Sequence, residues 1–176
     1  MLQYVHFSIH RSPNLDRAAN RLEEAIQNQQ HIVVYGDYDV DGTTAVALVF
    51  SILKNYTDVS YYIPDRYEEG YGLSYQGIDK ALERGASLLI ALDCGIKEVE
   101  KVAYANEKGL DIIVCDHHTP GTELPACIVL DPKQEHCNYP YKELCGCGVG
   151  FKLLQGWLQQ RGDSDEQLLQ HLDLVA

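Results

Sequence analysis

Three acidic residues alternate directly after an apolar run: Asp37, Asp39 and Asp41 follow the stretch 31–36. In an extended segment, side chains two positions apart point to the same side, so we expect the three carboxylates to converge. Carboxylates that lie close together repel one another unless a cation neutralises them. The spacing therefore predicts a site for a divalent metal ion at the end of a buried strand.

The same alternation of acids before Gly42 also opens calcium-binding loops. A calcium loop of that type needs a Glu about six residues after the glycine. Here the corresponding region, 45–48, is apolar and typical of a helix. The calcium-loop interpretation therefore fails.

Two later apolar runs also end in residues that bind metals. The run 88–92 leads into Asp93, and the run 111–115 leads into the segment 116–118, which is Asp-His-His. Parallel strands end at one edge of a sheet, and open α/β sheets place their sites at that edge. An isolated Asp-His-His is more often a surface turn, but its position after a strand favours a ligand role.

Short apolar runs alternate with helical patterns along the whole chain. The expected helices are 15–28, 42–55, 75–84 (capped by Ser74), 97–108, one from 146 and one within 165–176. The expected strands are 31–36, 59–63, 88–92, 111–115 and 127–130. This order predicts an α/β fold, with a five-stranded, mainly parallel sheet and helices on both faces.

Composition narrows the class of protein. A chain of 176 residues with 45% hydrophobic residues can form one domain with a full core. The net charge of −12 argues against a large basic cradle for nucleic acid, although bound metal ions would offset it locally. No stretch has the length of a membrane span or the pattern of a signal peptide, so we expect a cytoplasmic protein with no membrane partner. The six cysteines are scattered, and the pair Cys145 and Cys147 lacks the second pair of a structural zinc site.

The loop 64–73 is rich in glycine, charge and tyrosine. Arg66 and the tyrosines, Tyr71 among them, could bind phosphate or stack on bases, a mode suited to single strands. The alternative is that Tyr67, Tyr71 and Tyr75 pack on the sheet edge. Further along, Gly146 and Gly148 at a helix start would let a phosphate approach closely. Lys152 is either a phosphate contact or a solvated helix residue.

Six motifs together resemble the catalytic DHH domain of the RecJ single-strand-specific exonucleases, within the wider DHH phosphoesterase family. In family order they are residues 36–44, 64–73, 93–96, 116–118, 131–133 and 146–154. The resemblance covers the chain from about residue 15 to its end.

The resemblance implies a centre of two Mn²⁺ or Mg²⁺ ions. Asp93 would bridge both ions, Asp39 would bind one, and Asp41 with His117 would bind the other. Two such cations activate a water and neutralise charge on phosphorus, so carboxylate and imidazole ligands suit the chemistry.

Other positions take supporting roles by the same resemblance. Many relatives have a metal-binding His where this chain has Tyr35, and Asp37 would substitute for it. His118 would contact the scissile phosphate. Asp116 would hold an imidazole in the right tautomer.

The implied activity is metal-dependent phosphodiester hydrolysis, 5′-to-3′ on single-stranded DNA, in DNA repair and recombination. Repair or replication proteins would be further partners. One alternative is a DHH hydrolase of short oligonucleotides or cyclic dinucleotides. Another is a non-catalytic DHH scaffold, against which the intact Asp39, Asp41, Asp93 and Asp-His-His argue.

The family's last metal-binding Asp follows the segment that matches 172–176. By resemblance, we therefore expect residues 1–176 to be one DHH domain that stops before the fourth motif, with 1–14 as a lead-in segment. On this expectation the 176 residues alone would bind metal and cleave DNA weakly or not at all.

Overall fold

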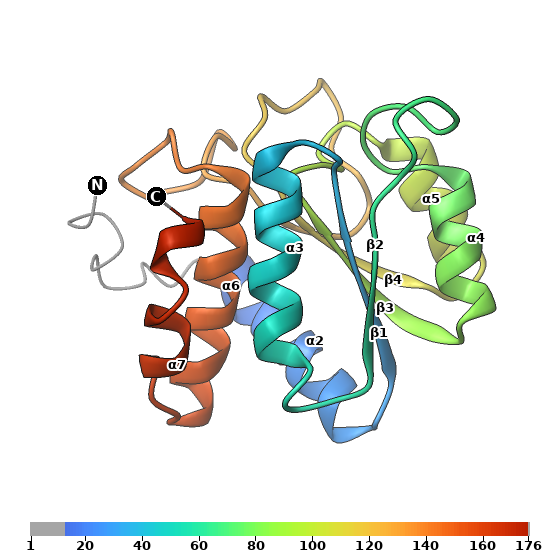
Figure 1. Cartoon of the computed structure of the whole chain (residues 1–176). Coiled ribbons are helices and arrows are strands. Elements are labelled where there is room, and N and C mark those ends of the chain that lie inside the picture. The colour runs from blue at the N-terminus through green and yellow to red at the C-terminus, as the bar shows by residue number, and fades with distance from the viewer. Residues whose placement is uncertain (1–12, 176) are drawn as a thin grey trace.

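The computed structural model describes residues 13–175. Five parallel strands form one sheet in the order β2-β1-β3-β4-β5 (Figure 1). The strands are β1 His31–Gly36, β2 Val59–Tyr62, β3 Ala86–Leu92, β4 Asp111–Cys115 and β5 Ile128–Leu130. The prediction of a five-stranded parallel sheet is confirmed.

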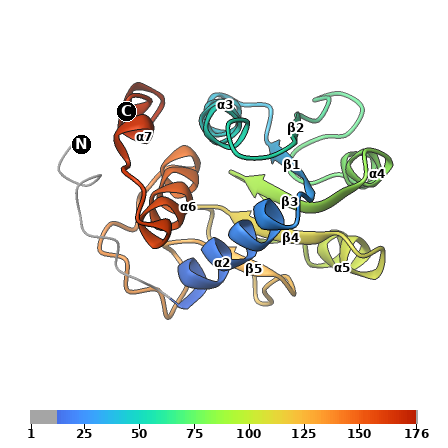
Figure 2. The same cartoon turned by 90° about the horizontal axis from the view of Figure 1, so that it is seen from below.

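Helices cover both faces of this sheet, as predicted (Figure 2). They are α2 Pro13–Gln27, α3 Val40–Leu53, α4 Tyr75–Glu83, α5 Val99–Glu107, α6 Gly146–Arg161 and the short α7 Glu166–Leu169, followed by a 3-10 turn at Leu172–Leu174. Alternate residues of each strand enter opposite cores, because successive side chains in a strand point to opposite faces. Ile32 and Val34 pack with α2, α3 and α6, whereas Val33 and Tyr35 pack with α4 and α5.

The ends of the elements follow their sequence signals closely. Ser74 caps α4, and its hydroxyl accepts from the Gly77 amide at 2.8 Å, as the sequence predicts. The helix α2 already begins at Pro13, so at most residues 1–12 of the predicted lead-in precede it, and these lie outside the described residues. Of the helices in the described chain, none combines the length and apolarity that crossing a membrane requires.

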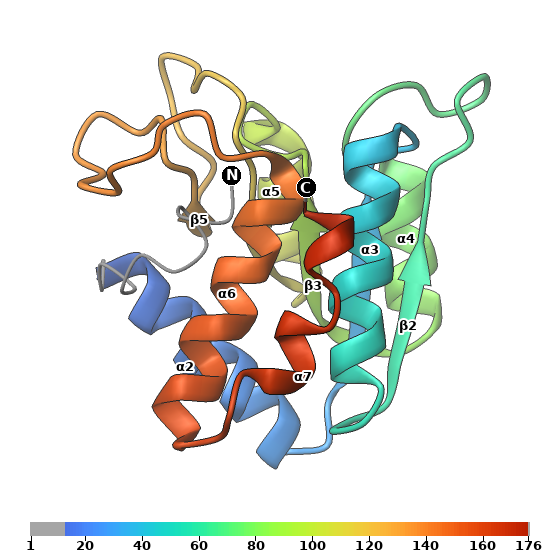
Figure 3. The same cartoon turned by 60° about the vertical axis from the view of Figure 1, so that its left-hand side comes forward.

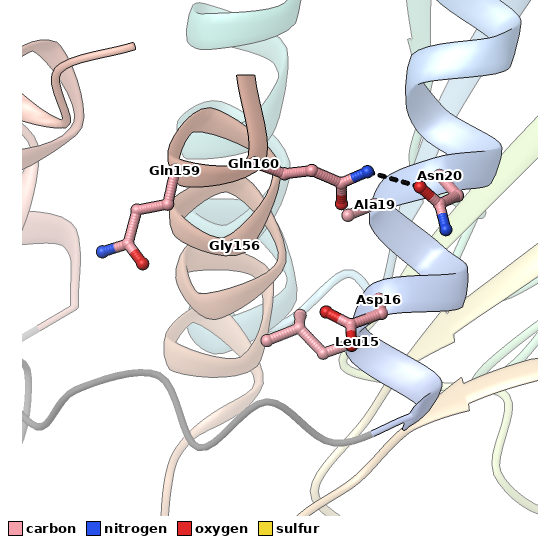
Figure 4. Close-up of a pocket in the computed structure, with 7 residues that line it drawn as sticks. All are labelled: Leu15, Asp16, Ala19, Asn20, Gly156, Gln159 and Gln160. Atoms are coloured by element: carbon pink, nitrogen blue, oxygen red, sulfur yellow. Dashed lines mark hydrogen bonds between the residues drawn. The ribbon is translucent and has the colours of Figure 1, made fainter. Parts of the chain in front are cut away.

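Helix α6 lies between α2 and α3 and joins the C-terminal part of the chain to the sheet layer (Figure 3). At its contact with α2, a Cβ on Gly156 would lie 3.1 Å from the Leu15 side chain, so the two helices approach closely. A pocket of about 330 Å³ borders this contact, where Gln160 donates to the Asn20 side chain (Figure 4). The predicted site residues all lie outside that pocket.

The loops at the carboxyl ends of the strands gather at the top of Figure 1. They are the segment between β2 and α4 and the segments on either side of β5. The first turns of α3 and α6 reach the same edge (Figure 1). This edge is where parallel α/β sheets place functional residues.

Candidate metal centre

Four adjacent strands end in register, and an aspartate follows each of them. The four are Asp37 after β1, Asp93 after β3, Asp116 after β4 and Asp131 after β5. The ladder extends into this row, because the Asp93 amide donates to the Cys115 carbonyl at 2.8 Å and the Asp116 amide to the Leu130 carbonyl at 2.9 Å. All four aspartates are buried, with exposed fractions of 0 to 3%. We call these four residues the acid row.

Three members of the acid row hold a buried carboxylate oxygen that has no hydrogen-bond partner within the described chain: Asp37 Oδ2, Asp93 Oδ1 and Asp131 Oδ2. Burying an unpartnered carboxylate costs several kcal/mol unless a cation or a donor compensates it. Such oxygens at neighbouring strand ends fit the donor set of a hard divalent cation. Burial of these oxygens therefore costs free energy of folding, and a bound metal ion would offset that cost.

The closest grouping of ligand atoms joins three elements. His117 Nε2 lies 3.1 Å from Asp93 Oδ1 and 3.6 Å from Asp41 Oδ2. At this separation His117 Nε2 and Asp93 Oδ1 are close enough to be ligands of one ion. Ligand atoms of Asp93, His117 and His118 all lie within 4.8 Å of one another. The structure thus brings together Asp41, Asp93 and His117, which were predicted to share metal.

The predicted extended arrangement of the first three acids is wrong. Helix α3 begins at Val40, because the Asp39 carboxylate caps it by accepting from the Gly42 amide at 2.9 Å. Asp41 therefore lies in the first turn of a helix, and Asp37 is buried while Asp39 is exposed. A tight turn and a helix start, not strand alternation, bring these acids near Asp93.

Helix α6 holds Asp41 in place. The amides of Gly146 and Cys147 donate to the two Asp41 carboxylate oxygens at 2.7 Å each. A helix N-terminus stabilises a negative charge because its first amides are unpaired and its dipole is positive there. The Gly148 amide donates to Cys145 Sγ at 3.3 Å. The phosphate contacts predicted for both glycines need revision, since their amides already have acceptors within the protein.

Position 146 requires a glycine for a steric reason. A Cβ at this position would lie 2.4 Å from Asp93 Oδ1 and 2.6 Å from Asp93 Cβ. No side chain fits there without moving Asp93. The glycine allows α6 to approach the acid row, so that Asp41 and Asp93 can serve the same ion.

The backbone of Asp93 adopts the left-handed region, with φ of 61°. Non-glycine residues rarely adopt this conformation, and such residues cluster at functional sites where the surroundings hold them. The turn immediately follows β3 and directs the chain into the loop that contains Gly95, with φ of 110°. Strain at Asp93 therefore coincides with the centre of the acid row.

Asp116 differs from its neighbours because both of its oxygens are paired. Oδ1 accepts from the His117 amide and from His118 Nδ1, each at 2.7 Å, and Oδ2 accepts from the Ile96 amide at 2.9 Å. A carboxylate that accepts from several donors is held in one orientation. It fixes the His118 ring so that Nε2 faces outward, where the Tyr71 hydroxyl lies 3.1 Å away.

The loop 64–73 reaches the site through aromatic contacts. The Tyr71 ring stands edge-on to both His118 and Tyr38, with centroids 5.9 and 6.1 Å apart. The Arg66 guanidinium lies over the Tyr38 ring, 5.4 Å from its centroid. A cation, two tyrosines and an imidazole thus form a continuous chain of contacts from the loop to the Asp-His-His segment.

The other two tyrosines of this region lie away from that chain of contacts. Tyr75 packs on Tyr104 of α5 with centroids 5.0 Å apart, as the packing alternative supposed. Tyr67 is 93% exposed. The two interpretations of the tyrosines therefore apply to different residues, and only Tyr71 reaches the Asp-His-His segment.

Lys152 is buried on α6, so the solvated alternative is wrong. Its ammonium donates to Gln155 Oε1 at 2.9 Å, and burial lowers the pKa of Lys152 to about 8. It borders a cavity of about 610 Å³ that Asp131 also lines. The phosphate contact remains a prediction for this residue.

Residues 31–176 match the DHH family, N-terminal domain. The chain belongs to the DHH family. Over 164 residues it is 45% identical to the single-stranded-DNA-specific exonuclease RecJ of Bacillus subtilis strain 168, covering 92% of this chain and 20% of that protein. Over 174 residues it is 37% identical to RecJ of Escherichia coli strain K12, covering 92% of this chain and 30% of that protein. The chain therefore spans less than a third of these curated relatives.

A crystal structure of exonuclease RecJ bound to manganese has the same fold. The TM-score is 0.86 at 34% identity, and the match covers 96% of this chain and 43% of that one. The resemblance inferred from the six motifs is thereby confirmed.

At two positions of this DHH domain, the structure shows a placement that was not predicted from the sequence. Asp131 lies in the motif 131–133 and follows an apolar run as Asp93 does, but no role was predicted for it from the sequence. Tyr35 stands where the resemblance implied a metal-binding His in many relatives, but its ring lies in the core on the other face of the sheet, and its hydroxyl donates to the Gly72 carbonyl at 2.8 Å. Asp37, two residues later, lies in the acid row instead.

The acid row predicts how stability depends on pH without metal. Burial raises the pKa of both Asp93 and Asp131 from 3.8 to about 6. The contact with Asp93 raises the pKa of His117 as well. Groups with a raised folded-state pKa stabilise the fold at low pH, and this contribution is lost as pH rises through the folded pKa. We expect these groups to make the metal-free domain less stable as pH rises through about 4 to 6 and beyond.

Urea unfolding of the wild type and of Asp93→Asn at about pH 4.5 and about pH 7 tests this expectation. Asp93→Asn should lose less stability between the two conditions, and Mn²⁺ should stabilise the wild type at the higher pH. An identical pH dependence in both proteins would contradict the assignment of a strained, ionisable carboxyl at Asp93.

Proposed function

We propose that this chain is the catalytic domain of a metal-dependent exonuclease that acts on single-stranded DNA. The observation that carries the proposal is the meeting of Asp41, Asp93 and His117 from three elements beside unpartnered carboxylate oxygens. The RecJ proteins, to which the chain is similar, are named single-stranded-DNA-specific exonucleases. We further propose 5′-to-3′ polarity, a role in DNA repair and recombination with repair or replication proteins as partners, and a cytoplasmic location. The free state of all six cysteines supports that location.

Two Mn²⁺ or Mg²⁺ ions would fit the residues present. Asp93 would bridge the two ions, Asp41 and His117, which lie close to it, would bind one of them, and the exposed carboxylate of Asp39 would bind the other. Bound ions would activate a water molecule and neutralise the charge that develops on the phosphate. Asp37 would hold an additional acceptor oxygen beside this set.

The chain's own residues would position the substrate. Asp116 accepts from His118 Nδ1 and so orients the ring, whose Nε2 would meet a phosphate oxygen. The Tyr71 hydroxyl lies 3.1 Å from that nitrogen. When a phosphate binds, the hydroxyl would have to move away or contact the same nitrogen together with the phosphate. Arg66 and Tyr38 lie one step further out, where a phosphate and a base of the strand could bind.

The proposal is tested on the gene product that contains this chain, with single-stranded and double-stranded oligonucleotides labelled at either end. We expect Mn²⁺-dependent release of nucleotides from single strands, starting at the 5′ end, and no activity with a chelator. Hydrolysis of cyclic dinucleotides or of very short oligonucleotides alone would favour the alternative DHH hydrolase. Tight Mn²⁺ binding without hydrolysis of any of these substrates would favour a scaffold.

Arg66→Ala is expected to weaken substrate binding rather than chemistry. Loss of one charge-assisted contact to a phosphate should raise KM for single-stranded DNA by about tenfold and leave kcat nearly unchanged. The control is Arg17→Ala, which removes the same charge from an exposed contact on α2. Steady-state kinetics with one oligonucleotide decide the case. A fall in kcat at unchanged KM would contradict a binding role for Arg66.

A further inference from the structure

Asp131 is the one member of the acid row that has no role in the proposed metal centre. Its side chain is 3% exposed. Oδ1 accepts from the Lys133 amide at 2.6 Å and so closes the turn after β5. Oδ2 is buried and has no hydrogen-bond partner among the described residues. A turn needs only the first oxygen, so the buried second oxygen requires another explanation.

The neighbour of Asp131 is the Asp-His-His segment. Cys115 and Leu130 are in register, and the Asp116 amide donates to the Leu130 carbonyl at 2.9 Å. Asp131 therefore stands beside Asp116 at adjacent strand ends, which lie about 4.8 Å apart in a sheet. The charges of Asp116 and His117 both act on the Asp131 carboxyl.

Of the two ring nitrogens of His117, one faces the proposed metal centre and the other has no role yet. Nε2 faces Asp93 and Asp41, so it is the nitrogen that would bind the metal. An imidazole that binds metal through Nε2 carries its proton on Nδ1, and that N–H is normally held by a carboxylate, a carbonyl or a water. In the described part of the chain, the polar contacts of His117 involve its amide and Nε2 only.

We propose that Asp131 is a positioning residue for His117: its Oδ2 accepts the Nδ1 proton, directly or through one water, when metal is bound. This inference rests on the metal centre of the proposed function. It explains why a turn-forming residue is a buried aspartate, since Ser or Asn could close the turn without burying a charge.

The decisive variant is Asp131→Asn. An amide has one acceptor oxygen, whereas the Lys133 amide and His117 Nδ1–H would both need one. One buried donor must then stay unpaired in the metal-bound state. We expect Mn²⁺ affinity, measured by calorimetry on the gene product that contains this chain, to fall by about tenfold or more. The metal-free variant should be at least as stable as the wild type near pH 7, because a buried unpaired charge is gone.

A spectroscopic signature separates positioning from turn formation. In the protein saturated with diamagnetic Mg²⁺, the His117 Nδ1–H should give an NMR resonance protected from exchange with water, and Asp131→Asn should lose that protection. The charge-matched control is Asp16→Asn, an exposed carboxylate on α2, which should change neither affinity nor resonance. If Asp131→Asn does not fold, Asp131→Ser keeps an acceptor for Lys133 and gives the same two readouts.

The outcomes distinguish this inference from the proposal beneath it. Metal binding and an Nδ1–H resonance that Asp131→Asn leaves unchanged would overturn the role of Asp131 alone. Failure of the unchanged gene product that contains this chain to bind Mn²⁺ or Mg²⁺ would overturn the metal centre, and this inference with it. Metal binding that depends on Asp131 without any DNA hydrolysis would support the inference and reject the nuclease.

Discussion

Replacing Asp93 with Ala is expected to lower the rate of DNA hydrolysis by about a thousandfold or more. Asp93 lies in the acid row between Asp37 and Asp116, and its Oδ1 is 3.1 Å from His117 Nε2. A carboxylate that bridges two ions would hold both of them, so its loss would remove the metal-activated water and the charge stabilisation together.

The measurement is steady-state turnover of a single-stranded oligonucleotide with Mn²⁺, using the gene product that contains this chain. Asp111→Ala is the matched control. Asp111 is the first residue of the neighbouring strand β4, so it lies at the opposite end of the strands from the acid row, in a surface ion pair with Arg21. Asp111→Ala should keep wild-type turnover with a small loss of stability. Near-normal turnover in Asp93→Ala would rule out the bridging role.

The second large effect is expected from Gly146→Ala. Alanine is a better helix former than glycine by about 1 kcal/mol, so helix propensity alone would favour the variant. The added Cβ would lie 2.4 Å from Asp93 Oδ1, however, and either α6 or Asp93 must shift. We expect Mn²⁺ affinity to fall by about tenfold or more and hydrolysis by about a hundredfold, since a misplacement of about 1 Å is enough for such a loss.

Calorimetric titration with Mn²⁺ and turnover of the same oligonucleotide measure both effects of Gly146→Ala. Gly121→Ala serves as the control, because its Cβ would meet its nearest neighbour at an ordinary 3.5 Å. Wild-type affinity and turnover in Gly146→Ala would show that α6 does not need to approach Asp93 so closely.

Four of the strands, β1, β3, β4 and β5, are short apolar runs with a clear end, and the acid that follows each of these four is visible in the sequence. The rule that identified Asp93 applies equally to Asp131, whose strand β5 has only three residues. The register that aligns four aspartates could not be read from sequence, because it depends on how the strands pair in space. The acid row is therefore a tertiary feature built from local signals.

The errors at the site have a common cause. Asp39 was expected to continue an extended segment, but its carboxylate caps α3 and turns the chain. Gly146 was expected to admit a phosphate, but it admits the Asp93 carboxylate of this same chain. Lys152 was weighed as solvated, but α6 is covered along this stretch and buries it. In each case the local sequence gave the residue type, and a partner distant in sequence decided its contact.

The most direct test of the metal centre is a crystal structure with Mn²⁺, read at the manganese absorption edge. We expect an anomalous peak within coordination distance of both Asp93 and His117 Nε2, with Asp41 on the same ion. Soaking with Mn²⁺ that gives no peak at these residues, or a peak only at other acidic groups, would contradict it.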